Sequence, residues 1–436
     1  MVGKIPKNQQ LNLFQTPLKN FINMQHELCI LAREIDWESI EKDLSKFYSE
    51  IGRPGIPIRK MVGLMLLKRI YNLSDENIVA RWTENPYWQY FCGEINFQVE
   101  PPIDPSEFVY FRERIGEEGA ERLLKLSVDL FGKDAMDDEV LYDTTVQEKN
   151  ITFPTDAKLH KKIIEKVRKI ATEEGISLRQ SYKRTVKQLM IDQRFRNHPK
   201  RSKKAKAAGR KLKTIAGRMT RDLERKLTDT QLNRYDKLLK IIKKILSQNR
   251  TDHDKIYSIH EPEVRCIAKG KEGKQYEFGN KSGIGITRKT GIVVSAIGFK
   301  GNPYDGHILD DQLDQTERMT GKSPKFAIVD RGFRGKKKIG DTEICIPRPI
   351  KNATAYQKHK IRLRFRARAG IEPVIGHIKH DHRMIRNYLK GVLGDNINTI
   401  MAATGFNLMK KLNQIRAEIL WLIFQLFRIR VFVFEI

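Results

Sequence analysis

The stretch EVLYDTTVQ, Glu139 to Gln147, marks the point at which the chain changes from helical to strand-like patterning. Its aromatic and β-branched residues are typical of a β-strand, and Asp143 lies in the middle of them. A carboxylate in a buried strand loses hydration, so it is expected to pair with a cation or to bind a metal ion. The stretch therefore predicts the first strand of a mixed α/β domain, with an acidic group of functional interest in it.

A β-hairpin and a helix are predicted after a long interruption. The segments Lys274–Thr287 and Gly291–Phe299 have the composition of strands and flank Arg288-Lys289-Thr290, which suits a hairpin turn. The segment Gly306–Thr320 has the pattern of a helix. The α/β domain that begins at Glu139 is therefore expected to be interrupted after its first strand.

A second candidate site residue follows a short apolar strand. Phe326 to Val329 is wholly apolar, which is typical of a strand buried on both faces, and Asp330 comes directly after it. Open α/β sheets bind ligands at the carboxyl ends of their strands, so Asp330 is well placed for a site. The alternative is that Asp330 only forms a turn. A further short strand, Glu343–Pro347, and a helix from Tyr356 onwards complete the predicted domain.

The third candidate lies in the segment FRARAGIEPVIGHIK, Phe365 to Lys379. On one helix of about 100° per residue, Phe365, Arg368, Glu372 and Lys379 would fall within a band of about 60°. A carboxylate would then share a face with two cations and a ring, which suits a phosphate beside a metal ion. An ordinary i,i+4 ion pair between Arg368 and Glu372 is the alternative.

This helix is expected to be interrupted. Pro373 follows Glu372, and a residue that precedes proline is disfavoured in the α region. A kink or a restart is therefore predicted at Pro373, with Gly370 accommodating the break.

Most of the remaining positive charge lies between these elements. The chain has 82 Lys and Arg residues against 53 Asp and Glu, a net charge of +29, which favours a polyanionic partner. Lys158–Arg250 carries most of this excess. Its apolar residues recur at helical spacing, which predicts ordered helices around a looser, charged middle from His198 to Lys213.

The first third of the chain is predicted to be helical. Ile58–Tyr71 is expected to be an amphipathic helix, and Ser74 is a candidate N-cap for a helix that runs through Trp82. Two helices across the turn Asn72-Leu73-Ser74 could form a DNA-binding helix-turn-helix. A helical bundle that reads no bases is the alternative.

The sequence favours a cytoplasmic protein. Its four cysteines form no CxxC pair, and the N-terminus has no apolar signal region. The apolar stretch Ile419–Ile436 contains Arg428 and Arg430, each costing about 2.5–3.5 kcal/mol at the centre of a bilayer. This stretch is therefore interpreted as a packing tail or an oligomer contact, with no membrane partner.

The chain resembles the DDE transposases of bacterial insertion sequences, in the group with a Tyr-x2-Arg-x3-Glu-x6-Lys signature. The resemblance extends over nearly the whole length and is strongest to the branch called insertion sequence family five. Phe365 stands where the signature has tyrosine, so a hydroxyl contact to phosphate is missing. The motifs that carry the resemblance are PYWQYFCGEINF, PIDPSEFVYFRERIG, LYDTTVQEKN, YSIHEPEV, YEFGNKSGI, GNPYDGH, VDRGFRG and RAGIEPVIGHIK.

The resemblance implies a ribonuclease-H-like catalytic core. Its first Asp lies on the first strand, its second follows the fourth strand and its Glu lies on a later helix, which correspond to Asp143, Asp330 and Glu372. Three carboxylates suit Mg²⁺, with Mn²⁺ as a possible substitute. By the same matching, Arg368 and Lys379 would hold transposon-end phosphates.

Two further residues are candidates for DNA contact. The ring of Phe365 can stack or pack, and Arg331, beside Asp330, is expected to orient it or to touch DNA.

The expected organisation has four parts. Residues 1–135 form a helical domain that binds DNA ends, 136–150 and 255–390 the catalytic core, 151–254 a basic helical insert, and 391–436 an apolar helical tail. The expected function is metal-dependent strand cleavage and strand transfer at terminal inverted repeats of double-stranded DNA, by a homodimer. The alternatives are a structure-specific nuclease without strand transfer and a catalytically silent DNA-binding repressor.

Overall fold

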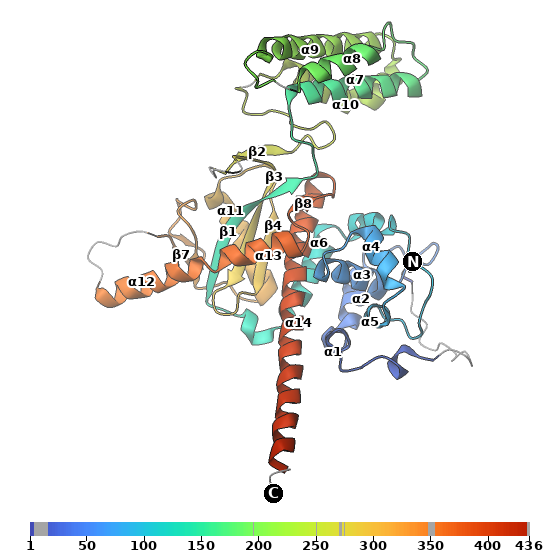
Figure 1. The fold of residues 1–436 in the computed structure, drawn as a ribbon. Coiled ribbons are helices and arrows are strands. Elements are labelled where there is room, and N and C mark those ends of the chain that lie inside the picture. Colours follow the sequence, from blue (N-terminus) through green and yellow to red (C-terminus); the bar gives the residue numbers. More distant parts are fainter. Residues whose placement is uncertain are drawn as a thin grey trace. The chain divides into compact units, whose positions relative to one another are not determined.

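A computed structural model of the chain describes residues 1–3, 16–194, 196–249, 251–269, 273, 275–347 and 354–433, without the side chains of 360 and 426–433. The chain divides into two compact units. The larger unit comprises Met1–Gln147 and Lys281–Ile436, and the smaller comprises Glu148–Asn280. Figure 1 labels most of the elements of both units.

The larger unit begins with helices, as the sequence predicts. Ser74 caps α4 through its hydroxyl, which accepts the N–H of Asn77 at 3.1 Å. At the start of α5, the amide oxygen of Asn85 accepts the N–H of Tyr87 at 3.0 Å. The short 3-10 turns Leu18–Asn20 and Gly132–Ala135 flank this group. The helices are α1 (Glu27–Glu34), α2 (Trp37–Ser45), α3 (Ile58–Ile70), α4 (Asp75–Trp82), α5 (Pro86–Phe91) and α6 (Glu107–Asp129).

The predicted amphipathic character of α3 is wrong. The helix is buried on nearly all sides, including Lys68 and Arg69, because it is enclosed by α2, α4, α6 and α14 (Gly391–Val433). Asp75 neutralises the buried Lys68 and also accepts a hydrogen bond from Arg112 at 3.0 Å. In the sequence, two charged residues at the C-terminal end of α3 suggest an exposed face. In the structure, both are buried and have partners in the interior.

The described strands form one eight-stranded mixed sheet. Its order is β2-β3-β1-β5-β7-β6, with β4 paired to β3 and β8 paired to β1. Strand β1 runs parallel to β5, β5 runs parallel to β7, and β3 and β4 form the predicted antiparallel hairpin. The strands are β1 (Glu139–Lys149), β2 (Arg265–Ala268), β3 (Tyr276–Thr287), β4 (Val293–Gly298), β5 (Phe326–Ile328), β6 (Lys338–Ile339), β7 (Thr342–Cys345) and β8 (Arg386–Asn387).

Four further helices complete the larger unit. They are α11 (Asp305–Thr320), α12 (Ala355–Arg368), α13 (Ile371–Asp381) and α14. Helix α14 contacts α1, α3, α6, α13 and β4, so it joins the N-terminal helices to the sheet (Figure 1). Its first half is core, with Ile400, Met401 and Leu408 fully buried. Beyond it, residues 420–424 are exposed apolar side chains.

Amide side chains of the helices pair with the edge strand β4. Asn407 of α14 accepts the N–H of Val293 at 2.9 Å and donates to its carbonyl at 2.8 Å. Gln315 of α11 accepts the N–H of Ala296 at 2.6 Å. An open edge strand exposes unpaired backbone groups, so these contacts provide partners for backbone groups of β4 and attach both helices to the sheet.

The smaller unit contains a helical bundle with its own apolar core, and its residues also include β2 and the start of β3. The expectation of a looser middle from His198 to Lys213 is wrong, because α9 runs through most of it. Ala205, Ala208 and Leu212 form a narrow buried stripe that the surrounding lysines conceal in the sequence. The helices are α7 (Asp156–Glu173), α8 (Lys183–Asp192), α9 (Ser202–Glu224) and α10 (Asp229–Ser247).

Among the described residues, no helix combines the length and apolarity that crossing a bilayer requires.

Replacing Asn407 by leucine tests how much the edge pairing contributes. The change keeps the size of the side chain but leaves both backbone groups of Val293 without partners, at about 1–3 kcal/mol for each buried group. The free energy of unfolding, measured by urea denaturation with tryptophan fluorescence, should fall by about 2 kcal/mol or more.

Asn413→Leu on the same helix is the matched control, because Asn413 is exposed. It should change the free energy of unfolding by less than about 0.5 kcal/mol. Equal effects of the two substitutions would contradict the role of Asn407.

Candidate functional site

Strand pairing brings Asp143 and Asp330 together. In the parallel pair β1–β5, Leu141 lies opposite Ile328, and each aspartate is two residues further along its own strand direction. The two aspartates therefore lie level with each other on neighbouring strands, Asp143 within β1 and Asp330 just past the end of β5. The sequence predicts Asp143 within one strand and Asp330 directly after another, but only the pairing makes them neighbours.

Asp143 is a partly desolvated carboxylate. Its side chain is 18% exposed, and its Oδ1 accepts the N–H of Thr144 at 2.7 Å. Burial raises its pKa to about 6, and the negative charges of Asp330 and Glu372 act in the same direction. The Thr144 N–H and Arg368 oppose this rise in pKa. A carboxylate in this environment favours a nearby cation.

Asp330 is held by the loop that follows β5. The N–H of Gly332 donates to its Oδ1 at 2.7 Å, which fixes the carboxylate in a tight turn. A Cβ atom at Gly332 would lie 2.9 Å from Asp330 Oδ1 and 2.9 Å from Asp305 Oδ2. Only glycine therefore fits between these two carboxylates without displacing them.

Arg368 bridges the first and third candidate carboxylates. Its guanidinium lies 3.5 Å from Asp143 Oδ2 and 3.8 Å from Glu372 Oε1. Glu372 is otherwise open, with a side chain that is 67% exposed. The i,i+4 pair considered from sequence is thus present, and the same arginine also reaches β1.

The prediction that four residues share one continuous helical face is wrong. Helix α12 ends at Arg368 and α13 begins at Ile371, so Phe365 and Arg368 lie on one helix and Glu372 and Lys379 on the next (Figure 1). The restart falls at Ala369-Gly370 and not at Pro373. Pro373 lies in the first turn of α13, where its missing N–H leaves no helical hydrogen bond unmade.

The remaining candidate residues differ in how far their side chains are buried. Phe365 is half-buried and packs against the hydrophobic core, and Lys379 is partly buried on α13. Arg331 is exposed directly after Asp330.

Asp305 is a site residue that sequence analysis missed. Its Oδ1 accepts hydrogen bonds from Thr144 Oγ1 at 3.1 Å and from Lys281 Nζ at 2.8 Å. Lys281 is itself nearly buried and also donates to the carbonyl of Pro303. The motif GNPYDGH predicts a turn before a helix, and an aspartate in the first turn of a helix has an ordinary structural explanation. Only the tertiary fold brings Asp305 beside Asp330.

The donor set suits a hard divalent cation. Carboxylate oxygens are the ligands that Mg²⁺ and Mn²⁺ prefer. In the described part of the chain, no three acidic, histidine or cysteine side chains converge closely enough to form a ready-made cage. The guanidinium of Arg368 instead occupies the space between Asp143 and Glu372 as a fixed positive charge.

Comparison with known families identifies the class of protein. Residues 16–114 match a family described as "Transposase domain (DUF772)", and residues 244–408 match one described as "Transposase DDE domain". Asp305, Asp330, Arg368 and Glu372 lie within the second match, and Asp143 lies between the two. No solved structure matches the chain.

One curated relative also matches. It is "Uncharacterized protein ORF8 in nfe locus" from Rhizobium meliloti, 41% identical over 198 residues, which are 44% of this chain and 96% of the relative. The chain belongs to the DDE transposase family and is an enzyme of that class. Its DDE domain implies a ribonuclease-H-like core, in agreement with the mixed sheet, and its transposase character implies DNA binding.

The raised pKa of Asp143 predicts a pH dependence of stability in the absence of divalent metal. The folded protein binds this proton more tightly than the unfolded chain does. The contribution of Asp143 to stability is therefore fully present below about pH 4. It is lost as the pH rises through about 6, the pKa of Asp143 in the fold.

Asp143→Asn mimics the protonated side chain and removes this dependence. In EDTA, its melting temperature should match the wild type near pH 4 and exceed it increasingly towards pH 7, as measured by thermal unfolding. A difference in melting temperature that does not change with pH would contradict the raised pKa.

Proposed function

We propose that this chain is the transposase of a bacterial insertion sequence of the Tyr-Arg-Glu-Lys group, close to insertion sequence family five. It would bind the terminal inverted repeats of its element and catalyse metal-dependent strand cleavage and strand transfer. The observation that carries the proposal is that the charges of Asp330 and Glu372 both act on Asp143. Asp143 lies on β1, Asp330 follows the parallel strand β5, and Glu372 lies on the later helix α13.

In this proposal the three carboxylates hold the metal. Asp143, Asp330 and Glu372 would bind Mg²⁺ or Mn²⁺, which when bound activates an attacking oxygen and stabilises the leaving oxygen of a phosphodiester. Deprotonated Asp143 favours a cation because its charge is poorly solvated. Glu372, mostly exposed on α13, can turn its side chain towards the aspartates.

Arg368 would then act on the substrate. Its guanidinium is paired with Asp143 and Glu372, and a divalent cation at those carboxylates would remove its partners. Arginine binds phosphate oxygens in a bidentate manner, so the freed group would hold a phosphate of the transposon end. Lys379 and Arg331 would supply further phosphate contacts. Phe365 has no hydroxyl to donate, so its role would be limited to packing or stacking.

The other parts of the chain would bind the remaining DNA. We assign end binding to residues 1–135, catalysis to 136–150 and 255–390, and contacts to flanking DNA to the basic insert, 151–254. Residues 391–436 would couple the N-terminal helices to the catalytic sheet. A homodimer is expected because two transposon ends must be processed together.

Alanine at Asp330 tests the catalytic assignment. Cleavage of labelled terminal-repeat DNA in Mg²⁺ should fall by at least about 10³-fold, because the developing charge would lose its metal-based stabilisation. Binding of the same DNA, measured by fluorescence anisotropy, should be retained.

Asp310→Ala is the matched control, because Asp310 is on α11 and pairs with Lys336 at the surface. It should cleave normally. Full cleavage by Asp330→Ala would overturn the assignment.

Joining of the labelled ends to a plasmid by the wild type separates a transposase from a nuclease. Absence of any metal-dependent cleavage would leave only a DNA-binding repressor.

Asp305→Asn tests whether Asp305 positions the metal-binding carboxylates. Asp305 contacts Thr144, whose N–H holds Asp143, and faces Gly332, whose N–H holds Asp330. Loss of such a supporting group typically weakens metal affinity by about 10–100-fold. Mn²⁺ binding, measured by electron paramagnetic resonance, should weaken accordingly, whereas Asp310→Asn should not change it. Unchanged Mn²⁺ affinity in Asp305→Asn would show that Asp305 is only structural.

A further inference from the structure

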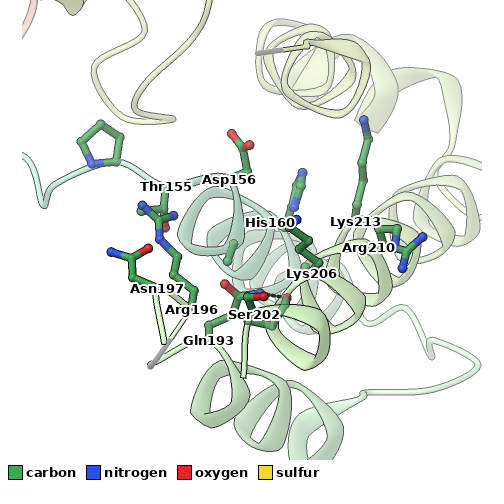
Figure 2. Close-up of a pocket in the computed structure, with 14 residues that line it drawn as sticks. Thr155, Asp156, His160, Gln193, Arg196, Asn197, Ser202, Lys206, Arg210 and Lys213 are labelled. Atoms are coloured by element: carbon green, nitrogen blue, oxygen red, sulfur yellow. Dashed lines mark hydrogen bonds between the residues drawn. The ribbon is translucent and has the colours of Figure 1, made fainter. Parts of the chain in front are cut away.

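The smaller unit contains a pocket of about 980 Å³ that the catalytic assignment does not use. It lies between the start of α7, the segment after α8 and the first half of α9 (Figure 2). Ten of its fourteen described lining residues are of polar or charged type. The lining comprises Pro154, Thr155, Asp156, Ala157, His160, Gln193, Arg196, Asn197, Ser202, Ala205, Lys206, Gly209, Arg210 and Lys213.

Four cations line this pocket without acidic partners. Lys206, Arg210 and Lys213 follow one another along α9 at a spacing of four and three residues, so they share a face, and Arg196 lies across from them (Figure 2). None of the four forms an ion pair with a described residue. Asp156 is the one carboxylate among the described lining residues.

Elsewhere in the same unit, several basic residues pair with acidic ones. Lys204 pairs with Asp192 at 2.9 Å, and Lys243 pairs with Glu224 at 2.8 Å. Arg234 pairs with Glu174 at 3.0 Å. Among the described residues, unpaired cations also occur outside the pocket, as at Arg184 and Lys187 on α8, so the distinguishing feature of the pocket is that four of them line one hollow.

A buried histidine also lines the pocket. His160 is only 6% exposed, and its Nδ1 has no hydrogen-bond partner among the described residues. Buried polar atoms are normally paired, so an orphan in a pocket wall indicates a ligand or solvent atom. Thr155, Asn197 and Ser202 add further hydrogen-bonding groups to the same wall.

We propose that this pocket binds phosphate groups of a DNA backbone. This inference rests on the proposed function and assigns the DNA contact of the basic insert to one surface. The cations and the His160 ring suit phosphate oxygens, which each accept several hydrogen bonds. No Phe, Tyr or Trp is among the described lining residues of this pocket, and Phe153 lines an adjoining hollow instead, so a nucleotide base would find no stacking platform within the pocket itself. The backbone of a duplex therefore fits better than a free nucleotide.

Removing two of the cations tests the proposal in the full chain. Arg210→Gln with Lys213→Gln should weaken binding of a 40-base-pair duplex of arbitrary sequence. The slope of log affinity against log salt should become less steep by about 1.8, or 0.9 for each lost phosphate contact, in fluorescence anisotropy titrations.

Arg184→Gln with Lys187→Gln is the matched control. It removes one arginine and one lysine from the same unit, and both residues are exposed on α8, outside the pocket and without ion pairs among the described residues. Its salt slope should stay near that of the wild type. Equal slopes for the two double variants would overturn the proposal, because binding would then reflect only total charge.

A substitution that adds charge provides a second test. Ser202→Glu places a carboxylate in the pocket at the first position of α9, where a negative charge favours the helix. It should weaken duplex binding, whereas Ala207→Glu, on the same helix outside the lining, should weaken it less. Equal weakening by the two would contradict the assignment.

The sources of phosphate can be separated by competition. Inorganic phosphate and ATP at millimolar concentration should not displace the duplex beyond the effect of matched ionic strength. Tight binding of ATP that depends on Arg210 and Lys213, with an unchanged duplex slope, would overturn the proposal in favour of a nucleotide site. If the wild type cleaves terminal-repeat DNA but the pocket variants bind like their controls, the pocket assignment fails and the transposase proposal stands.

Discussion

The arrangement of the larger unit depends on one electrostatic constraint, a carboxylate in the middle of a largely buried strand. Asp143 loses hydration, and two further carboxylates add to the cost of its negative charge. A cation must therefore accompany it, and Arg368 provides that charge in the structure. The same constraint explains why Asp143, Asp330 and Glu372 suit a divalent ion, which would supply more charge than one guanidinium.

The rest of the fold keeps these groups in place. Gln147, further along β1, donates to Thr399 of α14 at 2.6 Å, and Asn398 donates back to Gln147 at 2.8 Å. Asn398 also accepts a hydrogen bond from the buried Arg69 of α3 at 2.8 Å. A continuous set of hydrogen bonds therefore runs from the N-terminal helices through α14 to the strand that carries Asp143. The N-terminal helices are thus part of the support of the catalytic sheet.

Much of this could be predicted from the sequence, for physical reasons that differ between elements. Strand β1, the β3–β4 hairpin and α11 have clear strand or helix residue patterns bounded by turn residues, and Ser74 is a strong local capping signal. The burial of α3 and the helical structure of α9 are not evident from the sequence, because charged residues in both segments conceal a burial that only packing decides. A break near Gly370 could be predicted, although its position before Pro373 could not. The bridge from Arg368 to Asp143 and the approach of Asp305 to Gly332 depend on the tertiary structure. No spacing in the sequence encodes them.

The most direct test of the account is the position of a bound metal ion. A crystal structure of the full chain grown with Mn²⁺ should show an anomalous difference peak among the carboxylates of Asp143, Asp330 and Glu372. The Arg368 guanidinium should have moved away from the first and last of these. Mn²⁺ bound elsewhere, with Arg368 still bridging Asp143 and Glu372, would contradict the central claim that these three carboxylates form one metal site.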